Sequence, residues 1–266
     1  HQFNHDLVMY LFDHRDEKGI PTLTKKEWAE LNLKHDRETI VDALLQYIDF
    51  FKPNPPINNI TFQDMVDCFN TLRTKNPMDF YLDFDNTKDR VLEKFDDYSK
   101  TYKDFGLGVV QMGNSYINVS NYFNQTLRME CDTYGFKAAH HRWREGLNNK
   151  KELRTVLLAL WRLGNDVLNE HAFVVAFRLA TYIATQFKPH VAKFVYDVTD
   201  AKTVFDSSCG WGDRLAGFYC SNATEYYGCD PNPETFSMYQ QQVMAYETLL
   251  GNDFKMYSNE DMFVME

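Results

Sequence analysis

The sequence lacks the features that mark several classes of protein. None of its apolar runs approaches the roughly 20 residues that a membrane-spanning helix needs. Its five cysteines are scattered and odd in number, without the close pairs of a disulfide framework or a zinc ribbon. Low-complexity linkers and internal repeats are also missing. We therefore expect a globular cytoplasmic protein without a membrane partner or a bound metal.

Positive charge is also in short supply. The chain of 266 residues holds 28 lysines and arginines against 38 acidic residues, a formal net charge of -10. This balance argues against a protein that coats nucleic acid indiscriminately, although a local basic patch on an acidic body stays possible. The net charge alone therefore does not show whether the partner is a nucleic acid.

The first part of the chain is mostly helical in pattern. Thr24 and Thr61 stand where N-caps stand, each just before a helical segment, and Asp36 or Arg37 opens another. Further helices are predicted from about Thr87, and over 166–187.

Two stretches before residue 187 do not read as helix. The glycine, asparagine and β-branched residues of 106–123 predict a loop or a short hairpin. The proline-rich residues 52–59 predict a loop that ends the preceding helix. Taken together, we expect residues 1–186 to form a mostly helical region, a candidate for substrate recognition.

The last part of the chain alternates strands and helices. Val204 and Phe205 read as a short buried strand, residues 207–212 as a tight turn of small residues, and 213–220 as the helix that follows. A second strand over 226–229 ends on Asp230, and a third is predicted over 254–257. This alternation predicts an α/β fold with its cofactor domain at 187–266.

Spacing separates the kinds of cofactor that such a turn can bind. A dinucleotide fingerprint would have its third glycine at position 215, where Leu215 stands. A phosphate-binding P-loop would need a Gly-Lys-Ser/Thr run, which the sequence lacks. Asp206 is instead followed by Ser208, Gly210 and Gly212 at alternate positions.

This pattern resembles the first motif of class I S-adenosylmethionine-dependent methyltransferases, with Ser208 in place of the first glycine. The resemblance implies a Rossmann-like sheet and S-adenosyl-L-methionine as cofactor. It also implies that Asp206 serves the amino-acid end of the cofactor, directly or through water, and that Asp230 binds the ribose hydroxyls. Residues 121–129, Trp143 and the segments from 186 onward look similar to methyltransferases of bacteriophages and large DNA viruses.

The resemblance gives a set of candidate cofactor-binding residues. They are Phe187, Pro189, Asp206, Ser208, Cys209, Gly210, Trp211, Gly212, Asp230, Pro231, Asn232, Glu260 and Asp261. For Trp211, both a packing role and a role that faces cofactor or substrate stay open. The expected acceptor is a nucleic-acid base, above all the adenine amino group of DNA, and the expected location is the host cytoplasm if the protein is viral.

A candidate nucleic-acid contact lies earlier in the chain. Arginine forks bind phosphates and a tryptophan can stack on any base, so Arg142, Trp143 and Arg144 are candidates. The alternative is an amphipathic helix with a solvated basic face.

No catalytic residue is assigned. Residues 54–57 (Asn-Pro-Pro-Ile) resemble the catalytic tetrapeptide of amino-group methyltransferases, but Ile57 replaces its aromatic residue and the run lies between helices. A helix-terminating loop is the favoured interpretation. We expect the chain to be incomplete, with catalytic residues beyond Glu266. The rival hypotheses are a non-catalytic binding or interaction module, and a methyltransferase for small molecules or proteins.

Overall fold

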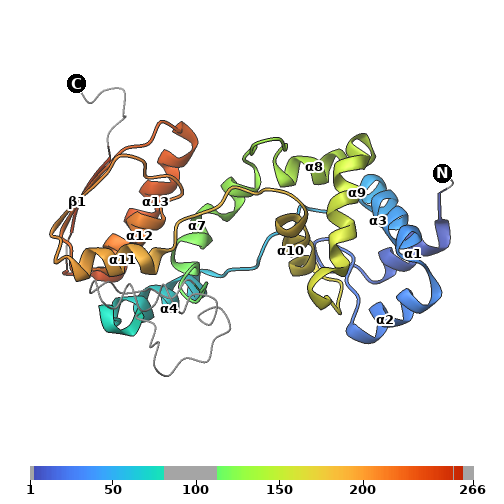
Figure 1. The fold of residues 1–266 in the computed structure, drawn as a ribbon, viewed down its shortest axis with the longest axis horizontal. Helices are drawn as coiled ribbons and strands as arrows, with labels where there is room; N and C mark the ends of the chain where they lie inside the picture. Colours follow the sequence, from blue (N-terminus) through green and yellow to red (C-terminus); the bar gives the residue numbers. More distant parts are fainter. Residues whose placement is uncertain (1–2, 81–112, 254, 260–266) are drawn as a thin grey trace, which may run out of the picture. The chain divides into compact units, whose positions relative to one another are not determined.

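The computed structural model describes residues 3–80, 113–253 and 255–259 (Figure 1). They divide into two compact units, of which unit 1 comprises His1–Asn59 and Gln125–Thr185 and unit 2 comprises Ile60–Asn124 and Gln186–Glu266. The boundary expected near residue 187 therefore lies where the chain passes from unit 1 into unit 2. Ile60–Asn124, however, belongs with the strands rather than with the other early helices.

Unit 1 consists of helices, most of which contribute buried side chains to a shared apolar core. Two predicted N-caps are confirmed: Thr24 accepts a hydrogen bond from the Glu27 N–H, and Asp36 accepts one from the Thr39 N–H. The helices are α1 (His5–Asp13), α2 (Lys25–Lys34), α3 (Arg37–Phe51), α8 (Ala139–Glu145), η2 (Gly146–Asn149), α9 (Lys150–Leu158), η3 (Ala159–Gly164) and α10 (Glu170–Ala180).

Unit 2 combines helices with a small sheet, which confirms the α/β class. Its three strands run parallel in the order β1-β2-β3, and α12 and α13 form the two crossovers between them. The elements are α4 (Phe62–Arg73), η1 (Pro77–Phe80), α11 (Pro189–Val198), β1 (Thr203–Asp206), α12 (Asp213–Cys220), β2 (Glu225–Gly228), α13 (Pro233–Leu250) and β3 (Met256–Asn259).

Helices pack on one face of this sheet. Val204 and Tyr226, paired across β1 and β2, are buried, and the ring of Phe218 from α12 lies 5.2 Å from that of Tyr226. Gly217 lets α11 approach α12 closely, since a Cβ there would lie 2.6 Å from the Pro189 carbonyl oxygen. On the opposite face, Phe205 is 63% exposed.

Helix α7 (Asn118–Met129) begins inside the stretch predicted as a loop or hairpin, so that prediction is wrong from Asn118 onward. Its residues up to Asn124 belong to unit 2 and those from Gln125 to unit 1. The sequence misled because Ser120 and Asn124, typical of loops, are buried here and hydrogen-bonded to other segments. The remainder of the predicted loop, and the helix expected from Thr87, lie mostly or wholly outside the described residues.

Two further boundaries differ from the predictions. Helix α10 spans Glu170–Ala180 rather than 166–187, because Asn169 caps its start and the chain becomes extended at Thr181. Strand β3 lies two residues later than predicted. Among the described residues, no helix is both long and apolar enough to cross a membrane.

Candidate functional site

The glycine turn (residues 207–212) joins β1 to α12 at the edge where the parallel strands end. Backbone hydrogen bonds fix it to the end of β2: the Cys209 N–H donates to the Cys229 carbonyl at 3.0 Å, and the Cys229 N–H donates to the Asp206 carbonyl at 3.0 Å. The turn and Asp230 are thus held side by side. In open α/β sheets this carboxyl edge is where ligands bind.

Both glycines of the turn adopt backbone conformations that other residues avoid. Gly210 has φ +57° and Gly212 has φ +77°. A Cβ on Gly212 would overlap the side-chain amide of Gln242, whose Nε2 donates to the Gly212 carbonyl at 2.9 Å. Tyr239, also on α13, donates its hydroxyl to the Gly210 carbonyl. The turn is therefore shaped by its glycines and supported by α13.

Asp230 faces the same turn from the end of β2. Its Oδ2 accepts the Gly210 N–H at 2.8 Å, and its Oδ1 accepts the Asn232 N–H at 2.9 Å. A carboxylate offers about four acceptor positions, so each oxygen keeps one for a ligand. The side chain is only partly buried, which leaves these positions accessible.

Asp206 is surrounded by donors from its own unit. Its Oδ2 accepts from the Tyr226 hydroxyl at 2.7 Å and from Arg214 Nε at 2.9 Å. Its Oδ1 accepts from Arg214 Nη2 and the Ser208 N–H, both at 3.2 Å. Arg214 is thus the counter-ion of a buried carboxylate.

Cys209 lies behind the turn, with its sulfur 3.4 Å from the Tyr226 hydroxyl. Burial raises the pKa of this thiol to about 12, so it stays protonated at neutral pH and is a poor nucleophile. Among the described residues, no group of three or more His, Cys, Asp or Glu side chains could hold a metal ion.

Helix α7 supports the far end of the turn. Ser120 donates its hydroxyl to Asp213 Oδ1 at 2.5 Å, and Gln186 Nε2 donates to the same oxygen at 2.9 Å. Asn124 Nδ2 donates to the Trp211 carbonyl at 2.9 Å. Asp213, the first residue of α12, is therefore buried and serves the packing of this unit.

The other predicted cofactor residues have varied surroundings. Phe187 is 43% exposed and its ring lies 5.3 Å from the guanidinium carbon of Arg214, so it is close to the turn. Pro189 is buried at the start of α11. Pro231 is exposed, and Asn232 caps α13 by accepting the Glu234 N–H at 3.0 Å. Glu260 and Asp261 lie outside the described residues.

The predicted nucleic-acid contacts Arg142 and Trp143 are buried in unit 1. Arg142 has no exposed surface and donates to the Lys137 carbonyl and to Thr181 Oγ1, at 2.9 and 2.8 Å. Trp143 is 1% exposed, and its indole N–H donates to the Pro53 carbonyl at 2.9 Å. Since neither side chain can reach a base or a phosphate from there, this structure argues against that prediction for both.

Arg144 is the exposed member of the trio. Its guanidinium forms a fork with both carboxylate oxygens of Glu130, at 2.7 and 2.6 Å. This pair raises the pKa of Arg144, with the hydrogen bond to Glu130 as the main cause. Nucleic acid would have to compete with that carboxylate.

The loop at 52–59, the proline loop, is bonded through part of its backbone to buried side chains. His140 Nε2 lies 2.9 Å from the Pro56 carbonyl oxygen, and Glu170 Oε2 accepts the Ile57 N–H at 3.2 Å. Gln125 bonds both the N–H and the carbonyl of Asn58, at 2.7 and 2.8 Å. These contacts favour the helix-terminating loop over the catalytic tetrapeptide.

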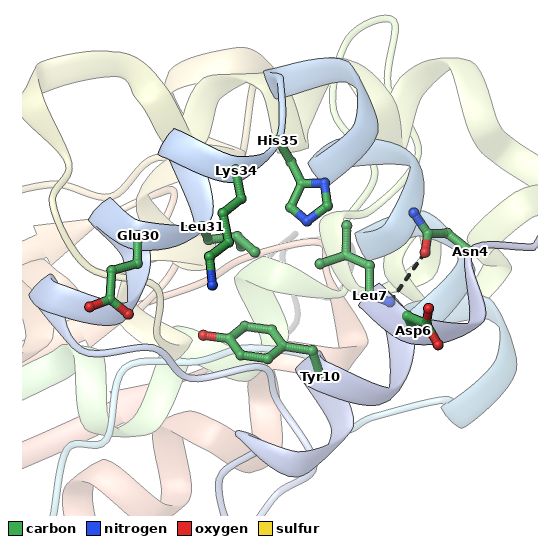
Figure 2. A pocket seen from close by; sticks show the side chains of 8 residues that line it. All are labelled: Asn4, Asp6, Leu7, Tyr10, Glu30, Leu31, Lys34 and His35. Atoms are coloured by element: carbon green, nitrogen blue, oxygen red, sulfur yellow. Dashed lines mark hydrogen bonds between the residues drawn. The ribbon is translucent and has the colours of Figure 1, made fainter.

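A cavity of about 330 Å³ lies between α1 and α2 in unit 1. Figure 2 shows the side chains of Tyr10, Glu30, Lys34 and His35 among those that line it. None of the predicted site residues lies there. Its lining mixes acidic, basic and apolar side chains and identifies no ligand class.

Sequence reasoning missed four residues that shape the glycine turn: Arg214, Tyr226, Tyr239 and Gln242. The last two stand three positions apart, a spacing that places both on one face of a helix, and this was the one signal that the sequence held for them. Tyr226 and Arg214 could not be paired with Asp206 without the fold.

A comparison with protein-family models finds no match to this chain, and searches among curated proteins and solved structures find no significant one.

Proposed function

We propose that this protein is an S-adenosylmethionine-dependent methyltransferase with a Rossmann-like cofactor domain, acting on a nucleic-acid base, with the adenine amino group of DNA as its acceptor. The observation that carries the proposal is the position of Asp230. Its two remaining acceptor positions beside a glycine turn, at the carboxyl edge of parallel strands, match the two hydroxyls of a ribose.

The residues of the turn fit this cofactor better than its competitors. S-adenosylmethionine carries no phosphate, and the turn lacks a lysine that would bind one. The positive φ of Gly210 and Gly212 lets a ligand approach the backbone without meeting a Cβ. When bound, the cofactor supplies an activated methyl group, and the contribution of the chain is to orient it.

The test of the cofactor site is calorimetric titration with S-adenosylhomocysteine. Asp230→Asn replaces one hydroxyl acceptor with a donor, so we expect binding to weaken at least 10-fold, on the order of 1.4 kcal/mol. Asp200→Asn is the matched control, since it removes the same charge from a side chain that is 85% exposed and pairs with Lys202. Equal affinities in the two variants would refute the site.

The test of the acceptor uses a labelled methyl group on S-adenosylmethionine, offered with DNA, RNA or a pool of nucleosides. We expect label in DNA, recovered as N6-methyladenine after digestion. Label in RNA or nucleosides alone would overturn the DNA assignment and leave the cofactor site intact.

A non-catalytic cofactor-binding module is the second candidate. It is favoured by the proline loop, since two backbone groups of the run that resembles the catalytic tetrapeptide, the Pro56 carbonyl and the Ile57 N–H, are bonded to His140 and Glu170. Saturable binding of S-adenosylhomocysteine without transfer to any acceptor would support this candidate over the first.

A further inference from the structure

The acid of the glycine turn has no acceptor position left for a ligand. Asp206 accepts four hydrogen bonds, from Tyr226, Ser208 and two nitrogens of Arg214. That number equals the capacity of a carboxylate. A ligand ammonium could bind Asp206 only by displacing one of these donors, so the direct contact implied by the family resemblance does not suit this chain.

Arg214, in contrast, keeps a hydrogen-bond donor available to a ligand. It uses Nε and Nη2 on Asp206, and Nη2 also donates to the Ser208 carbonyl. Within the described residues, its Nη1 makes no hydrogen bond, and 29% of the side chain is exposed. The guanidinium also lies over the ring of Phe187, 5.3 Å from its centroid. Its Nε and Nη2 are thus bonded to Asp206 and Ser208, while Nη1 stays available to a ligand.

We propose that Arg214 binds the α-carboxylate of the amino-acid end of the cofactor, and that Asp206 is the positioning residue that holds Arg214 in place. The inference rests on the proposed function, since it names a further contact in the same site. A guanidinium is suited to this task because its planar donors match a carboxylate.

The location of Arg214 agrees with a ligand that also reaches Asp230. Arg214 bonds the backbone of Ser208, and Asp230 bonds the backbone of Gly210. These two backbone positions are two residues apart, at most about 7 Å along the chain. An adenosine with a homocysteine-type side chain on its ribose offers a diol and a carboxylate to these two groups.

The charge of the site favours a carboxylate over a phosphate. Arg214 is already paired with Asp206, so the pair carries no net charge, and Asp230 adds a negative one nearby. A dianionic phosphate would meet this carboxylate without a second cation. The zwitterionic amino acid brings its own ammonium, which offsets that repulsion.

The experiment compares two ligands that differ only in the amino-acid end. Calorimetry on the intact chain measures S-adenosylhomocysteine and 5′-methylthioadenosine, which lacks the carboxylate, against wild type, Arg214→Gln and Arg214→Lys. We expect Arg214→Gln to weaken S-adenosylhomocysteine about 10- to 100-fold, the usual range for a charge-assisted hydrogen bond. Binding of 5′-methylthioadenosine should change less than twofold, and Arg214→Lys should restore part of the loss.

The outcomes separate three explanations. Loss confined to S-adenosylhomocysteine supports the inference, and retained 5′-methylthioadenosine binding shows that the site is still folded. An equal loss for both ligands assigns Arg214 a structural role only and overturns the inference, as does no loss for either. Wild type that binds neither ligand contradicts the proposed function itself.

Asp206→Asn tests the positioning role. It removes the charge that holds Arg214 while keeping one acceptor oxygen, so it should reproduce the selective loss in weaker form. If Asp206→Asn abolishes S-adenosylhomocysteine binding while Arg214→Gln leaves it unchanged, Asp206 is the direct contact and the inference is wrong.

Discussion

The proline loop of unit 1 and the glycine turn of unit 2 both resemble methyltransferase motifs, and they differ in what their surroundings leave unbound. In the proline loop, buried side chains hold the carbonyls of Pro53, Pro56 and Asn58. Around the glycine turn, Asp230 keeps hydrogen-bond acceptor positions, and Arg214 keeps a donor nitrogen, that no described residue occupies. Similarity to a sequence motif is therefore a weaker guide to a binding site than the hydrogen-bonding groups that remain available to a ligand.

The largest effect is expected for Trp143→Ala, which tests whether Trp143 supports the proline loop from inside unit 1. The side chain is buried and its N–H satisfies the Pro53 carbonyl, so the substitution leaves a cavity and an unpaired acceptor. We expect the free energy of unfolding to fall by about 3–5 kcal/mol in urea denaturation. Trp143→Phe, which keeps the ring, should lose less. Unchanged stability in Trp143→Ala would restore a surface role for this residue.

The glycine turn offers a matched pair of its own. Gly210→Ala and Gly212→Ala both place a side chain at positive φ, which costs about 1 kcal/mol. Only the second also overlaps Gln242, whereas the first has Ser208 O at 3.8 Å as its nearest neighbour. We expect losses of unfolding free energy of about 1 kcal/mol for Gly210→Ala and about 2–4 kcal/mol for Gly212→Ala. Equal losses would mean that α13 does not brace the turn.

Alkaline pH probes the buried thiol behind the turn. The folded state holds the Cys209 proton up to a pKa of about 12, whereas the unfolded thiol ionises near its ordinary value of 9.0. The unfolded state thus binds fewer protons in between, and the contribution of Cys209 to stability is lost as pH rises through this window.

The comparison with Cys209→Ala isolates this effect between pH 9 and 10. Wild type should lose stability more steeply than the variant, with a slope difference approaching 1.4 kcal/mol per pH unit. Burial lowers the pKa of Lys255 to about 8, which acts in the opposite direction but equally in both proteins. Parallel slopes would show that Cys209 is not buried as described.

The smallest effect is expected at Arg144. Its fork with Glu130 is an exposed pair, so Arg144→Ala should lower the free energy of unfolding by no more than about 1 kcal/mol. The loss should shrink in high salt, because exposed charges are screened. A loss as large as that of Trp143→Ala would contradict the assignment of Arg144 to the surface.

Local signals in the sequence were enough to predict much of the fold. Thr24, Asp36 and Thr61 cap helices as predicted, and α12 starts at Asp213 because the glycines before it end the strand and turn the chain. These features depend on neighbours within a few residues. The start of α7 was missed because the polar residues Ser120 and Asn124 are stabilised by distant segments.

The candidate site was predictable only in part, for the same reason. The spacing of Gly210 and Gly212 and the distance to Asp230 are properties of the sequence. The occupation of all four acceptor positions of Asp206 cannot be read from the sequence, since Tyr226 comes from the next strand and Arg214 from the following helix. Trp143 likewise looked like a base-stacking residue until its burial against Phe173 was known.

The glycine turn as a cofactor site is tested most directly by titrating the intact chain with S-adenosylhomocysteine. We predict saturable binding at one site per chain, weakened at least 10-fold by Asp230→Asn and unchanged by Asp200→Asn. An absence of saturable binding to the folded wild-type protein would contradict it.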